Sequence, residues 1–160
     1  MAEVVVLDTD MDSRLSEPEL SAWAQAWLAR RNLLFVTAPT VIERRYGYQS
    51  AFSHWKRLWE TYVELLAAGT VGVLPLDFEA AEIAGHLRAV CPVPRIGRRR
   101  RRSRSKAVRR VSWILDILIA ATSARHGYPL FTANGEDFQF LREKLGTQYR
   151  LDLVVYPALP

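Results

Sequence analysis

The sequence is short of the residues that build disulfides and zinc sites: 160 residues include one cysteine and three histidines. The lone Cys91 cannot form an internal disulfide, which agrees with a reducing compartment. The histidines His54, His86 and His126 lack the paired spacing of zinc ligands, and Cys91 has no second cysteine beside it. A zinc centre is therefore not predicted, and any metal site must rely on oxygen ligands.

Long apolar runs are also missing. No stretch of about 18 apolar residues occurs, so we predict no membrane-spanning helix and no membrane partner. The first residues, MAEVVVLD, lack the basic region, the long apolar stretch and the cleavage site of a secretory signal. A cytoplasmic protein is expected. The length suits one domain, 1–160, with a single core, and no internal repeat is visible.

Positive charge is concentrated in one segment. Ten of the 22 Lys and Arg residues lie within 95–110, which contains no acid, whereas the rest of the chain has 12 bases and 17 acids. This asymmetry predicts a polyanionic partner, nucleic acid first. The alternative for this Arg-rich loop is a solvated, disordered segment without a ligand. The predicted nucleic-acid contacts are Arg98, Arg99, Arg100, Arg101, Arg102, Arg104 and Lys106.

Apolar patterning predicts strands that alternate with helices. The expected strands lie at 4–7, 33–36, 71–74, 128–132 and 151–156. Their nearly continuous apolar character favours an α/β fold in which a mainly parallel sheet of about five strands is covered on both faces. The helix that begins near Pro39, with Thr40 as a possible cap, is expected to break or kink at Gly47. The helix from about 111 onward is predicted to be buried nearly all round.

Four acids end or abut these predicted core elements. Asp8 follows the first strand, Glu43 lies on the helix after the second, Asp116 sits within an apolar helix, and Asp137 follows the short strand after it. Convergent carboxylates repel one another, so such a cluster at a sheet edge persists mainly when a divalent cation neutralises it. Oxygen ligands favour Mg²⁺ or Mn²⁺. Asp12 is interpreted as a loop or cap residue.

Three segments of the chain carry a family resemblance. They are VVVLDTD around Asp8, TVIERRYG around Glu43, and DILIAATSARHGYPLFTANGEDF around Asp116 and Asp137. In order and approximate spacing they resemble the PIN-domain ribonucleases, particularly the VapC-type toxins of VapBC toxin–antitoxin modules. The third segment is the most specific. The resemblance implies a PIN-like three-layer α/β/α fold and hydrolysis of RNA phosphodiester bonds.

Residue by residue, the resemblance implies roles for the positions of this chain that match the family's motif. Asp8, Glu43, Asp116 and Asp137 resemble the catalytic, metal-binding acids of the family. Thr132 and Asn134 match supporting polar positions, and Asp10 stands where the family usually has Asn, which adds negative charge to the site. A cognate antitoxin and a homodimer are the protein partners that the resemblance implies.

Other interpretations of the same residues stay open at this stage. Asp8 and Asp10 could begin a haloacid-dehalogenase-type phosphatase site, although no paired acid motif occurs late in the chain. Residues 8–19 partly match an EF-hand calcium loop, but Ser13 occupies the position that requires glycine. Taken singly, Glu43, Asp116 and Asp137 could be helix-capping or helix-start acids. A non-catalytic RNA-binding relative with the same fold is the last alternative.

Overall fold

The computed structural model describes residues 2–93 and 106–157. Strands and helices alternate along most of this length, as the apolar pattern predicts. In chain order, the elements are β1 (Val4–Leu7), α1 (Thr9–Ser13), α2 (Pro18–Ala29), β2 (Leu33–Thr37), α3 (Ala38–Ala51), α4 (Trp55–Ala67), β3 (Val71–Leu74), α5 (Phe78–Val90), α6 (Lys106–His126), β4 (Leu130–Thr132), α7 (Gly135–Leu145) and β5 (Leu153–Val155). None of the helices in the described ranges is long and apolar enough to cross a membrane.

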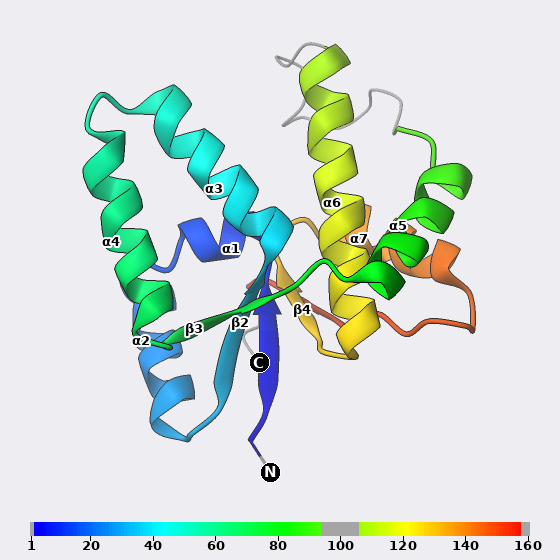
Figure 1. Cartoon of the computed structure of the whole chain (residues 1–160). Coiled ribbons are helices and arrows are strands. Elements are labelled where there is room, and N and C mark those ends of the chain that lie inside the picture. The colour runs from blue at the N-terminus through cyan, green and yellow to red at the C-terminus, as the bar shows by residue number, and fades with distance from the viewer. Residues whose placement is uncertain (1, 94–105, 158–160) are drawn as a thin grey trace.

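The strands form one sheet in the order β3-β2-β1-β4-β5, and every pairing is parallel. β1 lies at the centre, between β2 and β4 (Figure 1). The chain runs from β1 to β2 on one side and later returns to β4 on the other, so the strand order reverses between β1 and β4. In open α/β sheets, ligands bind beyond the carboxyl ends of the strands at this switch point.

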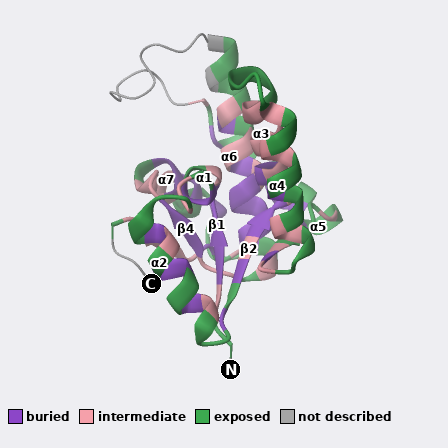
Figure 2. Ribbon diagram, turned by 90° about the vertical axis from the view of Figure 1, so that its left-hand side faces the viewer, coloured by how far each residue is buried: buried purple, intermediate pink, exposed green. Residues whose placement is uncertain are grey.

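Side chains alternate between two cores along β1. Val5 and Leu7 pack against α1 and α2 on one face, whereas Val6 packs into the cluster of α5, α6 and α7 on the other. Figure 2 shows most of β1 in the colour of buried residues. Burial of both strand faces explains the continuous apolar runs that the sequence shows. The three-layer α/β/α arrangement predicted for this chain is confirmed.

The longest helix, α6, is less buried than expected. Trp113, Ile117 and Ala120 are buried against the neighbouring elements, but Val111 and Ile114 near its first turns are exposed. The prediction of a helix buried nearly all round is therefore wrong for its N-terminal part. The helix also begins at Lys106, so residues 106–110 of the predicted Arg-rich loop are helical.

Two helix starts differ from the predictions. Thr37, at the end of β2, caps α3 by accepting a hydrogen bond from the Thr40 N–H at 3.2 Å, so Thr40 is not the cap. Helix α3 also continues through Gly47 to Ala51 without the predicted break, and no heavy atom crowds the position where a Cβ would lie at Gly47. The second helix start that differs is that of α7, which begins at Gly135, so that Asp137 lies in its first turn instead of before it.

Candidate metal centre at the carboxyl end of the sheet

Asp8 immediately follows the central strand and caps the single turn of α1. Its side chain is buried, and Oδ1 accepts a hydrogen bond from the Met11 N–H at 2.8 Å. The hydroxyl of Thr132, the last residue of β4, donates to Asp8 Oδ2. The structure therefore fixes Asp8 at the switch point between β1 and β4. The residues from Thr9 to Ser13 are helical, which rules out the EF-hand interpretation of this segment.

A chain of hydrogen bonds continues from Asp8 to Asp137. The Thr132 hydroxyl that donates to Asp8 also accepts from the Asn134 N–H at 2.8 Å. The Asn134 side-chain amide then donates from Nδ2 to Asp137 Oδ2 at 2.9 Å. Thr132 and Asn134 thus orient one predicted metal ligand each, and they connect the end of β4 to the first turn of α7.

Glu43 reaches the site from helix α3. It lies on α3, and the Thr9 hydroxyl, next to Asp8 in the chain, donates to its Oε2. This contact brings residues separated by 34 positions together. The charge of Glu43 also acts on Asp8. Glu43 therefore lies near Asp8 in the folded chain, and its role as a metal ligand stays a prediction.

Burial and like charges leave Asp8 hard to ionise. Removal from water raises the pKa of Asp8 to about 7, and the charges of Asp10 and Glu43 push in the same direction. The hydrogen bonds from Thr132 and Met11 oppose this shift only in part. A cation beside Asp8 would supply the missing countercharge.

Asp116 is partly buried on α6, which packs against α3 and β2. Its approach to the other acids stays a prediction. Within residues 2–93 and 106–157, no three Asp, Glu, His or Cys side chains are grouped closely enough to enclose a metal ion. The buried Asp8 carboxylate, with the carboxylate of Glu43 acting on it, nevertheless fits Mg²⁺ or Mn²⁺, which prefer oxygen ligands.

The sequence interpretation of Asp12 as a loop or cap residue is wrong, because the caps of α1 are Asp8 and Arg14. Asp12 lies on α1 with a fully buried side chain, and its Oδ2 is 3.1 Å from Arg44 Nε on α3. Burial raises the pKa of Asp12, while the positive charge of Arg44 and the Tyr62 hydroxyl lower it. The sequence offers two adjacent arginines, Arg44 and Arg45, but carries no signal that links either of them to Asp12. Which arginine faces inward depends on the helix packing, which the sequence did not reveal.

Most of the predicted nucleic-acid contacts, Arg98 to Arg102 and Arg104, lie outside the described residues. Lys106 begins α6. Their contribution to binding stays a prediction.

The fold and the site together define a class: a parallel α/β/α domain with buried acids, held by hydrogen bonds, at its sheet switch point. The comparison with protein families agrees, because a family model for the PIN domain matches residues 5–144. The chain belongs to the PIN domain family. None of the curated proteins compared with the chain matches it.

Solved structures share this fold at low sequence identity. The chain is similar to VapBC2 from Rickettsia felis, solved bound to a DNA fragment from its promoter, with 16% identity, a TM-score of 0.66, and 96% and 98% of the two chains covered. DNA-bound VapBC from Salmonella typhimurium gives 17% identity, a TM-score of 0.64 and the same coverage. VapBC-5 of the toxin–antitoxin systems of Mycobacterium tuberculosis gives 23% identity, a TM-score of 0.55, and coverage of 95% and 98%. At these identities the likeness concerns the fold.

Proposed function

We propose that this protein is a metal-dependent endoribonuclease and the toxin of a toxin–antitoxin pair. The observation that carries the proposal is the buried Asp8 at the switch point of a PIN domain, with its pKa raised to about 7 and with Glu43 beside it. A carboxylate in these surroundings is costly unless a cation joins it. The position of Asp8 in the fold is the position where α/β domains bind ligands.

In the proposed reaction, the protein positions oxygen ligands and the metal supplies the Lewis acidity. A bound Mg²⁺ or Mn²⁺ would lower the pKa of water and stabilise negative charge on the phosphoryl group. The chain's part is orientation: Met11 and Thr132 hold the two oxygens of Asp8, Asn134 holds Asp137, and Thr9 holds Glu43. Asp8, Glu43, Asp116 and Asp137 would bind the ion, with Asp10 adding negative charge nearby.

RNA as the substrate rests on the family and on the charge distribution. The Arg-rich segment 95–110 precedes Asp116 closely in sequence, and it would neutralise phosphates. Replacing Arg98 to Arg102 with alanine should weaken RNA binding and flatten its dependence on salt, because each lost phosphate contact lowers the slope by about 0.7 for single strands. An unchanged slope in fluorescence anisotropy titrations would remove this segment from the RNA site.

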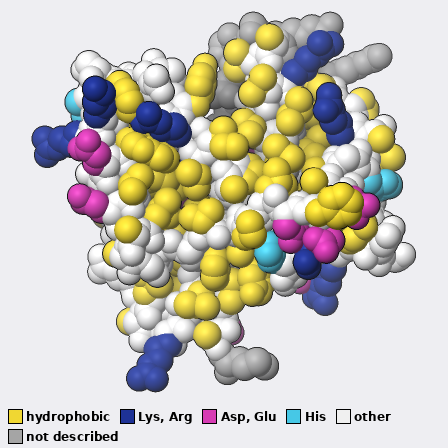
Figure 3. Space-filling model, viewed as in Figure 1, with side chains coloured by type: hydrophobic (Ala, Val, Ile, Leu, Met, Phe, Trp, Pro, Cys, Tyr) yellow, Lys and Arg dark blue, Asp and Glu magenta, His cyan; other side chains and the backbone are white. Residues whose placement is uncertain are grey.

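A protein partner is supported by apolar side chains on the surface. Ile42 and Tyr46 on α3 are 59% and 72% exposed, and Val111 on α6 is 58% exposed. Figure 3 shows hydrophobic side chains gathered across the middle of this face of the molecule. Exposed apolar groups of this kind are typical of protein interfaces. The solved neighbours are VapBC complexes, so we propose a cognate antitoxin as the partner. We also propose a homodimer and a cytoplasmic location.

A non-catalytic RNA-binding role is the second candidate. It is favoured by the lack of a three-acid cluster among the described side chains and by Asp10, which stands where the family usually has Asn. The haloacid-dehalogenase interpretation receives no support from the family assignment.

An RNA cleavage assay separates the two candidates. The purified protein should cleave labelled RNA with Mg²⁺ or Mn²⁺ and lose this activity with EDTA. Protein carrying Asp8→Asn, purified in parallel, controls for contaminating nucleases. Binding of RNA without cleavage under every metal condition would favour the binding protein instead.

A further inference from the structure

Helix α1 carries one partner of a buried ion pair that does not include any of the proposed metal-binding acids. Helix α1 has five residues, and a helix of one turn is not stable on its own because nucleation costs more than a few hydrogen bonds return. Its position must therefore be set by contacts with the rest of the fold. Met11 supplies one such contact, since it is fully buried in the core beside α2.

The second contact is the pair formed by Asp12 and Arg44. The Asp12 side chain is 1% exposed, that of Arg44 is 17% exposed, and Nε lies 3.1 Å from Oδ2. The Arg44 guanidinium also lies over the rings of Tyr48 and Tyr62, 4.7 Å and 5.2 Å from their centroids, and Nη2 donates to the Tyr48 hydroxyl. Two rings and an acid thus hold the guanidinium in one orientation, which a flexible surface ion pair does not achieve.

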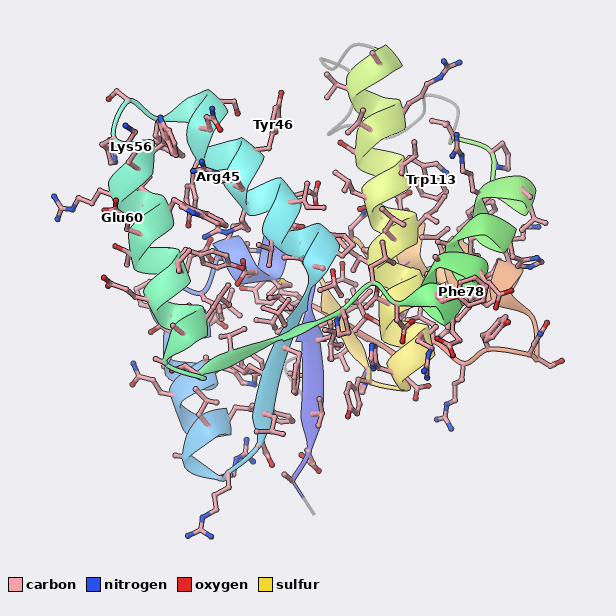
Figure 4. The ribbon with its side chains drawn as sticks, viewed as in Figure 1. Arg45, Tyr46, Lys56, Glu60, Phe78 and Trp113 are labelled. Carbon is pink, nitrogen blue, oxygen red and sulfur yellow. The ribbon has the colours of Figure 1, made fainter. Side chains whose placement is uncertain are left out.

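The neighbouring arginine shows that α3 is tied in two directions. The Arg45 guanidinium lies 4.2 Å from the centroid of the Trp55 ring and 5.1 Å from that of Trp59, both on α4. In Figure 4, Arg45 points toward α4, whereas Tyr46 extends from another side of α3. Arg45 therefore joins α3 to α4, and Arg44 joins α3 to α1.

The ion pair lies next to the acids in sequence on both elements. Asp12 follows Asp8 by four residues, one helical turn, and Arg44 directly follows Glu43. The contact between Thr9 and Glu43 is a second link between these two elements. Two links separated by most of a turn restrict rotation of α1 relative to α3, which one link alone would permit.

We propose that the Asp12–Arg44 pair is a positioning device that holds α1 against α3 and thereby fixes the relative positions of Asp8 and Glu43, the two acids proposed to share a divalent cation. Asp12 and Arg44 are positioning residues and do not contact the ion. The inference rests on the proposed function for its link to metal binding, although the restraint on α1 is independent of it.

The test compares two carboxyl-to-amide variants of the full chain. Asp12→Asn removes the charge that faces α3, whereas Glu17→Gln removes the exposed partner of Arg14, 2.9 Å away, just after α1. In metal-free buffer, the Met11 amide should exchange about tenfold faster or more in Asp12→Asn. Mn²⁺ affinity measured by calorimetry should fall about 10- to 100-fold, the usual loss when the support of a metal ligand is removed. Glu17→Gln should change neither quantity by more than about twofold.

If the pair only stabilised the fold, Mn²⁺ affinity would recover in any variant that regains stability. The double variant Asp12→Leu/Arg44→Met replaces the ions with apolar side chains, which often restores stability. Because apolar contacts are not directional, we expect the double variant to regain its unfolding midpoint while its Mn²⁺ affinity stays low. Wild-type Mn²⁺ affinity and wild-type Met11 exchange in folded Asp12→Asn would overturn the inference. If that variant does not fold, Arg44→Lys, which keeps the charge but loses the planar contacts, is read by the same criteria.

Failure of the proposed function would give a different result. If the wild-type protein neither bound Mn²⁺ nor cleaved RNA, the proposed function would fail, and exchange of the Met11 amide would still decide whether the pair holds α1.

Discussion

The two aspartates at the ends of α1 have contrasting electrostatic surroundings. Asp12 faces the Arg44 guanidinium, so the protein itself provides its countercharge. Asp8 receives hydrogen bonds from Thr132 and Met11, but the charges that act on it are those of the acids Asp10 and Glu43. Both carboxyls are buried within one helical turn of each other. The difference indicates that the charge of Asp12 is paired within the fold, whereas that of Asp8 is available to a ligand.

The largest expected effect concerns catalysis. Asp8→Asn should reduce metal-dependent RNA cleavage at least about 100-fold, because the metal contributes several kcal/mol to transition-state stabilisation. Cleavage rates at saturating Mn²⁺, measured with folding checked by circular dichroism, provide the test. Asp116→Asn should have a similar effect, since Asp116 is proposed as a ligand of the same ion. Full activity in carefully purified Asp8→Asn would mean that the contrast between the two aspartates has no catalytic meaning.

The pH dependence of the free energy of unfolding should reveal the cost of ionising the buried Asp8 carboxyl. The pKa of Asp8 is raised from 3.8 to about 7. Between these values the native state holds a proton that the unfolded state has lost, so the free energy of unfolding falls as pH rises from about 4 to about 7. In EDTA, Asp8→Asn should lack this decline and exceed wild type by roughly 2–4 kcal/mol above pH 7.

Urea titrations at several pH values measure this difference. A destabilised Asp8→Asn at pH 8, or parallel pH profiles for the two proteins, would contradict the assignment of a strained carboxylate.

Metal addition should cancel this strain. At a free Mn²⁺ concentration about 100 times the dissociation constant, the free energy of unfolding should rise by about 2.7 kcal/mol. The gain should be absent from Asp8→Asn and should disappear on chelation. Differential scanning fluorimetry with Mn²⁺ and then EDTA checks this expectation, and an equal gain in both proteins would place the ion elsewhere.

The smallest effect is expected at Thr132. Thr132→Val keeps the shape of the side chain but removes the hydroxyl that donates to Asp8 and accepts from Asn134. Losing the hydrogen bond to Asp8, worth about 1–1.5 kcal/mol, corresponds to a roughly tenfold lower cleavage rate. The matched control is Thr61→Val on exposed α4, where the hydroxyl donates only to the Arg57 carbonyl among the described residues. Equal rates for both variants would show that Thr132 does not orient Asp8.

Local sequence patterns predicted the strands and the acids that follow them. A run such as Val4 to Leu7 can only be a buried strand, and the polar residue after it must lie at the sheet edge. The helix starts were harder to predict, because several Thr and Pro residues near Pro39 satisfied the same capping rules. In the structure, Thr37 caps α3 because it is the last residue of β2.

Tertiary pairing was beyond the sequence. Asp12 looked like a loop or cap acid because α1 is too short to give a periodic pattern, and its partner lies 32 positions away on α3. The exposed start of α6 was missed for a related reason: an apolar side chain such as Val111 does not show by itself whether it faces a core or a surface. Packing between elements decides both cases.

The acids at the carboxyl end of β1 are proposed to bind a divalent cation, and crystals grown with Mn²⁺ and examined by anomalous diffraction would locate that ion. We expect an anomalous peak within coordination distance, about 2.0–2.2 Å, of an Asp8 oxygen, with Glu43 or Asp116 as a further ligand. A fully occupied Mn²⁺ site elsewhere, with Asp8 still bonded only to Thr132 and Met11, would contradict it.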